Sequence, residues 1–175
     1  PLGMAIAPDR RSFYIANTDA VIRYPYQVGQ DRLQGKPTTI TQLTGGRYNQ
    51  HWTSNLVFSP DGSKLYVSIG SQSNVDPEDL PRASIQAMNP DGSDRQTYAS
   101  GLRNPVGLAF HPVTQLLYAT VNERDGLGDD LVPDYLTSVR AGGFYGWPYS
   151  YLGNHPDPRL PRRPELENRA LVPEV

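Results

Sequence analysis

The chain has 175 residues, of which 16 are glycine and 17 are proline, and its formal net charge at pH 7 is −2. Proline removes a backbone donor and both residues interrupt helices, so this composition excludes a helical bundle. Balanced charge gives no electrostatic footprint for nucleic acid, and no apolar window is long enough to span a membrane. Without cysteine, the chain has no disulfides, thiolate metal sites or cysteine nucleophiles.

One pattern occurs three times along the chain: an apolar run, a turn that contains proline, and a second run that contains tyrosine. The turn prolines are Pro8, Pro60 and Pro112, so the pattern recurs every 52 residues. Each copy is typical of a β-hairpin, because proline presets φ and Asp-Gly supplies a tight reversal. Two equal intervals of this size indicate a repeat architecture.

A third strand is predicted after each hairpin, and a fourth after the first two. The predicted ranges are 20–26, 84–89 and 135–139 for the third strands and 38–43 and 95–100 for the fourth. Four short antiparallel strands per unit form one blade of a β-propeller. We therefore expect an all-β propeller with about 3.4 four-stranded blades. The alternative is a meandering β-sandwich with coincidental spacing.

The blades are expected at about residues 1–50, 51–102 and 103–155. Closed propellers use about four to eight blades, so we expect the chain to be a piece of a longer polypeptide. Prolines recur through residues 156–175, and this segment is expected to be an extended connector toward a further blade.

Loops that interrupt a repeat often carry function, and the first such loop runs from Gly45 to Thr53. It contains His51 just before a predicted strand, among amide, hydroxyl and indole groups. An imidazole with an ordinary pKa of about 6.5 suits proton transfer near neutral pH. The alternative is a structural histidine that binds a neighbouring loop.

The pair Arg103 and Asn104 stands before the first strand of the third unit. Arg103 and His51 are 52 residues apart, so the period places them at equivalent points of adjacent blades. Such points converge on the propeller axis, which predicts a polar pocket there. The alternative for Arg103 is a guanidinium that anchors a loop.

The second interruption, residues 122–134, is rich in acids and is bent by two glycines. Oxygen-rich loops of this kind suit Ca²⁺, although the spacing is not that of an EF-hand. The alternative is a solvated acidic turn. The following Gly142–Tyr149 is a glycine-bent aromatic cluster, which fits either a sugar-stacking wall or a plug that enters the core.

From His51 to Gly153 the chain resembles the quinoprotein sugar dehydrogenases, in particular the aldose and sorbosone dehydrogenases that depend on pyrroloquinoline quinone (PQQ). The matching elements are HWTSNLVFSPDGSKLYVSIGS, GLRNPVGLAFHP, NERDGLGDDLVPDYLTSV and GGFYGWPYSY. The resemblance implies a six-bladed propeller with PQQ and Ca²⁺ at one end of its axis. It implies a sugar substrate, an external electron acceptor such as a cytochrome or a quinone, and a periplasmic or secreted location.

By the same resemblance, His51 matches the general base, Arg103 and Asn104 match quinone contacts, and Arg124 and Asp125 match the carbonyls that bind Ca²⁺. The loop is longer here and lacks the Gly-Pro of the glucose-oxidising members, and Gln50 replaces their aspartate. Other cofactor contacts of the family lie outside this chain. Two other functions stay open: a non-catalytic propeller that binds carbohydrate or protein, and a propeller lactonase or hydrolase.

Overall fold

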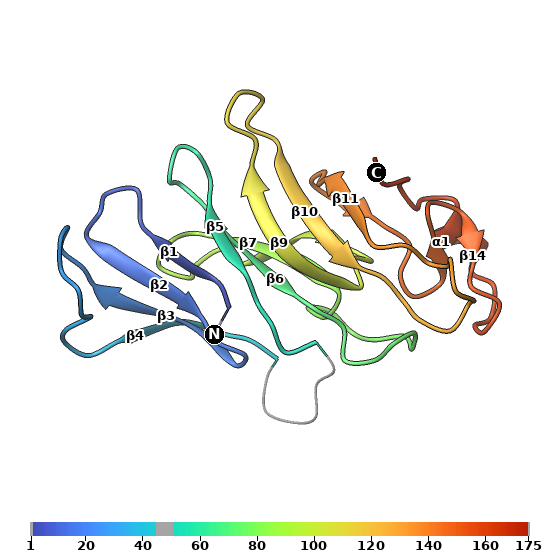
Figure 1. Ribbon diagram of the computed structural model, residues 1–175, viewed down its shortest axis with the longest axis horizontal. Helices are drawn as coiled ribbons and strands as arrows, with labels where there is room; N and C mark the ends of the chain where they lie inside the picture. Colours follow the sequence, from blue (N-terminus) through green and yellow to red (C-terminus); the bar gives the residue numbers. More distant parts are fainter. Residues whose placement is uncertain (1, 45–50, 175) are drawn as a thin grey trace.

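The computed structural model describes residues 2–44 and 51–174, and its sheets lie side by side along the long axis of the molecule (Figure 1). The first sheet is an antiparallel meander in the spatial order β1-β2-β3-β4. Its strands are β1 (Met4–Ile6), β2 (Ser12–Ala16), β3 (Ala20–Pro25) and β4 (Thr38–Gln42). All four strands were predicted from the repeat.

The second sheet is a meander of four antiparallel strands with a fifth, parallel strand at its edge. Its strands are β5 (Leu56–Phe58), β6 (Leu65–Ile69), β7 (Ser84–Met88), β8 (Gln96–Ser100) and β12 (Gly143–Phe144). The Pro60 turn joins β5 to β6, with the Gly62 N–H donating to the Ser59 carbonyl over 2.8 Å.

The third sheet has three strands, β9 (Asn104–Phe110), β10 (Leu117–Asn122) and β11 (Tyr135–Ser138). The described part of this sheet has no fourth strand, and the sequence predicted fourth strands only in the first two units. The chain instead turns at Gly142, where φ is 72°, and β12 pairs with β8 of the second sheet. Burial of Tyr145 between the two sheets accounts for this crossing, because Tyr145 belongs to the core they share.

A short ribbon follows the third sheet, formed by β13 (Ser150–Tyr151) and β14 (His155–Pro156). The segment from residue 156, expected to be an extended connector, contains a one-turn helix, α1 (Pro164–Glu167). Pro164 fits the first turn of α1, where its missing N–H has no intrahelical partner to lose. The Leu171 N–H then returns to the Phe144 carbonyl over 2.8 Å.

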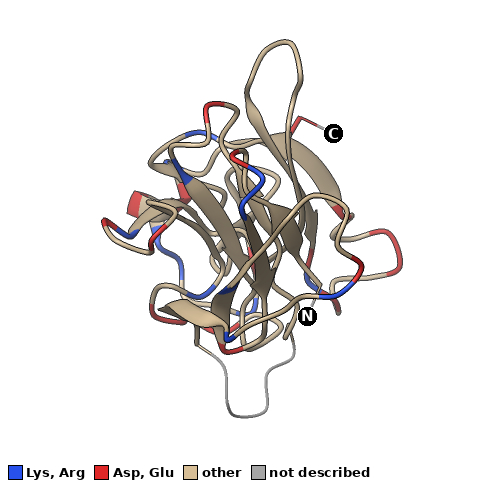
Figure 2. Cartoon of the chain, turned by 90° about the vertical axis from the view of Figure 1, so that its left-hand side faces the viewer, with Lys and Arg blue, Asp and Glu red and all other residues tan. Residues whose placement is uncertain are grey.

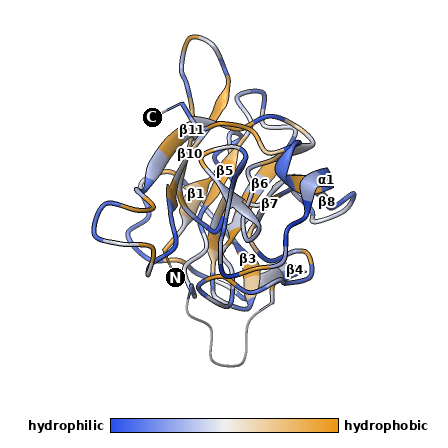
Figure 3. Ribbon diagram, turned by 90° about the vertical axis from the view of Figure 1, so that its right-hand side faces the viewer, coloured by the Kyte–Doolittle hydropathy of each residue, from blue (hydrophilic) through white to orange (hydrophobic). Residues whose placement is uncertain are grey.

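The core lies in two layers between neighbouring sheets, as the alternation of hydropathy along the strands requires (Figure 3). Between the first and second sheets, Tyr14 meets Phe58 edge to face at 5.0 Å. Between the second and third sheets, Ile85 packs in one buried cluster with Leu117 and Val121. Each sheet is therefore apolar on faces that meet a neighbour, as blades of a propeller are.

In the described residues, Lys and Arg are interspersed with Asp and Glu along the cartoon of Figure 2. Within the described residues, no helix has the length and apolar character needed to cross a membrane.

Candidate functional site

The chain segments that enter β5 and β9 meet the loops that follow β6 and β10 at one end of the second and third sheets. Both loops leave the same lower edge of the sheets in Figure 1. The Ser71 N–H donates to the Arg103 carbonyl over 2.7 Å, which ties the loop after β6 to the entry of β9. This end therefore gathers His51, Arg103 and Asn104 from adjacent sheets, as the 52-residue period predicts.

His51 is half-buried, and its Nδ1 lies 3.0 Å from the Ser71 carbonyl oxygen and 2.9 Å from Ser71 Oγ. A carbonyl oxygen only accepts, so Nδ1 carries the hydrogen and Nε2 is the basic nitrogen. Burial lowers the pKa of His51, and the positive charge of Arg103 lowers it further. The imidazole is thus neutral near pH 7, with Nε2 able to accept a proton.

Gly70 makes the close approach of these residues possible. A Cβ at this position would lie 2.5 Å from His51 Cβ and 2.6 Å from Asn104 Oδ1. The amide of Asn104 is 7% exposed, and its Nδ2 donates weakly to Asn122 Oδ1 over 3.4 Å. Within the described residues, Asn104 Oδ1 has no hydrogen-bond partner.

Arg103 is 3% exposed, and most of its N–H groups donate hydrogen bonds within the chain. Its Nε and Nη2 donate to the carbonyl and side-chain oxygens of Asn74 over 3.0 and 2.8 Å. Its Nη1 donates to the Glu123 carbonyl over 2.6 Å and to the Asn122 carbonyl over 3.4 Å. Burial lowers the pKa of Arg103, while the Asp125 carboxylate, 3.7 Å from Nη2, opposes that effect.

Arg124 and Asp125 were predicted to offer backbone carbonyls to Ca²⁺, and their side chains lie in different surroundings. The Asp125 carboxylate is 85% exposed beside Arg103. The Arg124 side chain is fully buried and pairs with Glu123 at 3.0 Å and with Asp157 at 3.2 Å. Arg159 pairs with the same Asp157 at 2.8 Å, so this network anchors the chain around β13 and β14.

The Asp125 carbonyl, expected to bind Ca²⁺, already accepts two hydrogen bonds. Asn74 Nδ2 donates to it over 3.0 Å and Arg159 Nη1 over 2.6 Å. The Arg124 carbonyl lies 3.5 Å from the Val132 amide. The described residues also hold no group of three or more histidine or acidic side chains that could bind a metal. The residues in these positions therefore do not fit a Ca²⁺ ion at the Asp125 carbonyl.

A polar guest beside His51 fits better than Ca²⁺. The glycine at position 70 lets His51 and Asn104 pack close together, and Asn104 Oδ1 is a buried acceptor without a partner among the described residues. Arg103 adds a buried positive charge. The charge of Arg103 fits the carbonyl and carboxylate oxygens that PQQ carries, and Asn104 Oδ1 fits a donor such as the pyrrole N–H of PQQ.

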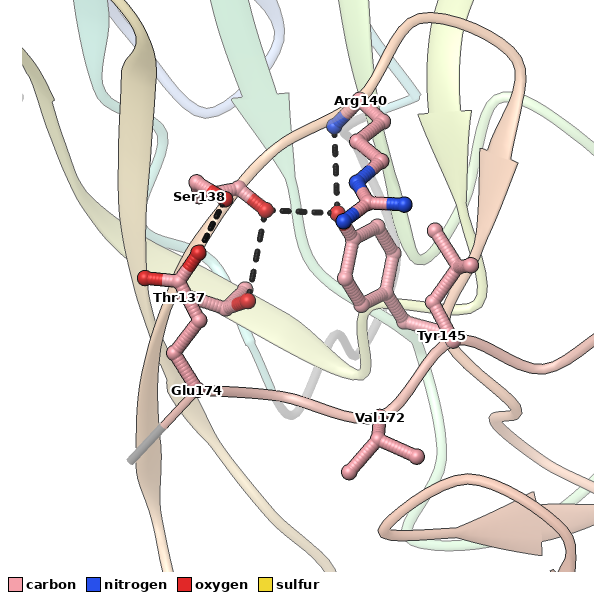
Figure 4. Close-up of a pocket in the computed structure, with 7 residues that line it drawn as sticks. Thr137, Ser138, Arg140, Tyr145, Val172 and Glu174 are labelled. Carbon is pink, nitrogen blue, oxygen red and sulfur yellow. Dashed lines mark hydrogen bonds between the residues drawn. The ribbon is translucent and has the colours of Figure 1, made fainter.

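The aromatic cluster is a plug and not a wall. Tyr145 and Trp147 are 2% and 3% exposed, and Trp147 Nε1 donates to the Asn74 carbonyl over 3.0 Å. A separate cavity of about 230 Å³ lies where the Tyr145 hydroxyl meets Ser138 and Arg140, with Glu174 at its rim (Figure 4). This cavity shares no residue with the site around His51.

Two residues of the site, Ser71 and Asn74, were not predicted. The signal that marks them is the period itself, because the loop after β6 lies 52 residues before the loop after β10. The residues Gly45–Gln50, which include the glutamine before His51, lie outside the described residues.

The chain is thus built of antiparallel sheets packed face to face, with a polar site at one end of two of them. The model of the TrAA12-like family matches residues 2–134, and the chain belongs to that family.

The fold matches the calcium structure of a Carbohydrate-Active Enzymes family AA12 protein from Trichoderma reesei. That match has a TM-score of 0.80 and 20% identity, over 99% of this chain and 54% of the other. The PQQ domain of a pyranose dehydrogenase from Coprinopsis cinerea matches with a TM-score of 0.79 and 17% identity, over 99% of this chain and 53% of the other.

An uncharacterised protein from Borreliella burgdorferi is 34% identical over 119 residues, which are 67% of this chain and 30% of that protein. The chain thus spans about half the length of the solved structures and less of this relative.

Proposed function

We propose that the chain is part of a quinoprotein dehydrogenase that oxidises an aldose or a related sugar aldehyde or alcohol with PQQ as cofactor. The observation that carries this proposal is that Ser71 binds His51 Nδ1 and leaves Nε2 without a partner among the described residues, while the buried guanidinium of Arg103 is near enough to lower the pKa of His51. Family membership and the PQQ domain of the Coprinopsis cinerea relative support the same reaction class.

His51 Nε2 is the base that takes the proton from the sugar hydroxyl, since its lowered pKa keeps it unprotonated at neutral pH. Bound PQQ supplies a carbonyl that accepts the hydride. Arg103 and Asn104 hold the cofactor, and the positive charge of Arg103 stabilises the charge that develops on its oxygens. No step is assigned to calcium, because the Asp125 carbonyl is already filled.

The proposal extends beyond this chain to the whole protein. We infer a closed six-bladed ring, of which this chain supplies about half, since it covers 54% of the Trichoderma reesei structure. The pocket is then completed by other blades, and the 175-residue chain alone oxidises sugar slowly or not at all. An external electron acceptor, such as a cytochrome or a quinone, and a periplasmic or secreted location complete the proposal.

The test is a sugar titration of the full-length protein loaded with PQQ, followed by absorbance. Sugar should bleach the oxidised quinone in the wild type and in His155→Ala, whose histidine is exposed and distant in the chain. The bleaching should disappear in His51→Ala. A full-length protein that binds no quinone would overturn the proposal and favour a carbohydrate- or protein-binding module. Quinone binding with unimpaired bleaching in His51→Ala would remove the proposed base.

A further inference from the structure

Asn74, in the loop after β6, forms hydrogen bonds to several chain segments at this end of the sheets. Its carbonyl accepts from Arg103 Nε and from Trp147 Nε1, each over 3.0 Å. Its Oδ1 accepts from Arg103 Nη2 over 2.8 Å and from the Asp125 amide over 3.0 Å. Its Nδ2 donates to the Asp125 carbonyl over 3.0 Å. One residue therefore joins loops from the second and third sheets.

Only a carboxamide of this length satisfies all three side-chain contacts. Its oxygen has two lone pairs for Arg103 and the Asp125 amide, and its nitrogen donates to the Asp125 carbonyl. An aspartate at this position keeps the acceptors and loses the donor, and alanine loses both. These three hydrogen bonds therefore require asparagine at position 74, and another polar residue would not form all of them.

The consequence for Arg103 is a fixed orientation. Asn74 holds the Nε and Nη2 edge of the guanidinium, and the Glu123 carbonyl holds Nη1 over 2.6 Å. With the longer contact to the Asn122 carbonyl, all but one of the N–H groups are used within the chain. The remaining N–H belongs to Nη2, the nitrogen that lies 3.7 Å from the Asp125 carboxylate.

We propose that Asn74 is a positioning residue that aims the guanidinium of Arg103 and the backbone of Asp125 at the quinone pocket. The inference rests on the proposed function, because the pocket is defined by that function. Asn74 acts through Arg103, so a change at Asn74 also affects the pKa of His51. The charge of Arg103 lowers this pKa, and the charges of Glu78 and Asp125 raise it.

The experiment compares Asn74→Ala and Asn74→Asp with Asn89→Ala in the full-length protein. Asn89 is a matched control, because its side chain also makes two hydrogen bonds, to Lys64 and Ser93, at the opposite end of β7. The readouts are PQQ affinity by absorbance titration, the pKa of His51 by NMR in the cofactor-free protein, and the melting temperature.

We expect Asn74→Ala to weaken PQQ binding about tenfold or more, as loss of a hydrogen bond to a charged group does. Asn74→Asp should raise the pKa of His51, because a carboxylate beside Arg103 offsets the charge that lowers this pKa. Asn89→Ala should change the melting temperature only. If Asn74→Ala does not fold, the pKa of His51 in Asn74→Asp still tests the inference.

An Asn74→Asp variant with the wild-type His51 pKa, or a folded Asn74→Ala variant with wild-type PQQ affinity, would overturn the inference. The proposed function fails differently, since in that case the wild type itself would bind no PQQ. The two failures are therefore distinguishable.

Discussion

Replacing Gly70 by alanine tests whether the close contact of His51 and Asn104 shapes the site. The added Cβ would lie 2.5 Å from His51 Cβ and 2.6 Å from Asn104 Oδ1. Carbon atoms in contact are separated by about 3.5–4.0 Å, so the neighbours must move by about 1 Å. Overpacking of this kind costs about 1–3 kcal/mol of stability, and a displacement of about 1 Å at a reacting group lowers the rate about 10²-fold.

The assay is urea unfolding together with sugar-dependent bleaching of PQQ in the full-length protein. Gly107→Ala in β9 is the matched control, since its Cβ would lie 2.5 Å from Thr120 Oγ1. Both variants should lose stability, and only Gly70→Ala should lose about 10²-fold in the rate of sugar oxidation. Wild-type rates in Gly70→Ala would refute the reasoning that the close contact of His51 and Asn104 at this glycine shapes the site.

Three further predictions concern charge. The pKa of His51 in the folded chain lies below its ordinary 6.5, so the unfolded chain binds the proton first as the pH falls. Stability should therefore decrease as the pH drops from 6.5 through the lowered value. Denaturant curves of His51→Gln should lack this loss, and an identical loss in that variant would assign it to another group. Asp157→Asn removes one of the two carboxylates that pair with the buried Arg124 and should cost about 3 kcal/mol or more in urea unfolding. The exposed Glu165→Gln should cost much less. Equal losses would contradict a buried network. The cofactor-free protein should melt at the same temperature in millimolar calcium as in EDTA, because the Asp125 carbonyl already accepts two hydrogen bonds. A rise of several degrees with calcium would show that the ion displaces Arg159 from this carbonyl.

The period of 52 residues predicted most of the fold, because turn chemistry and strand alternation are local properties of the sequence. The third strands at 20–26, 84–89 and 135–139 correspond to β3, β7 and β11 with small changes at their ends. The pairing of Gly143–Phe144 with β8 was not predictable in this way, since it depends on where Tyr145 finds room in the core.

The site was predicted in part for the same reason. The period brings His51 and Arg103 to one end of adjacent sheets, and the structure places them there. The period places the loop of Asn74 at this end, but the role of Asn74 could not be predicted, because it depends on a guanidinium and a backbone that come from the third sheet. The contact of Arg159 with the Asp125 carbonyl likewise depends on how the last segment folds back.

The pKa of Asp157 shows how strongly that segment is held. Burial alone would raise this pKa, but hydrogen bonds from Arg159 and Arg124 outweigh burial and set it at about 2. The carboxylate therefore stays ionised, and the network Glu123, Arg124, Asp157 and Arg159 stays neutral overall. This charge balance explains why a buried arginine is tolerated beside the site.

The measurement that tests the central claim most directly is a titration of oxidised PQQ into the full-length protein and into its Arg103→Gln variant. The account predicts saturable one-to-one binding to the wild type. Binding should be at least about tenfold weaker in the variant, because the buried charge that is proposed to hold the cofactor is removed. Equal binding to a folded Arg103→Gln protein, or no binding to the wild type, would contradict it.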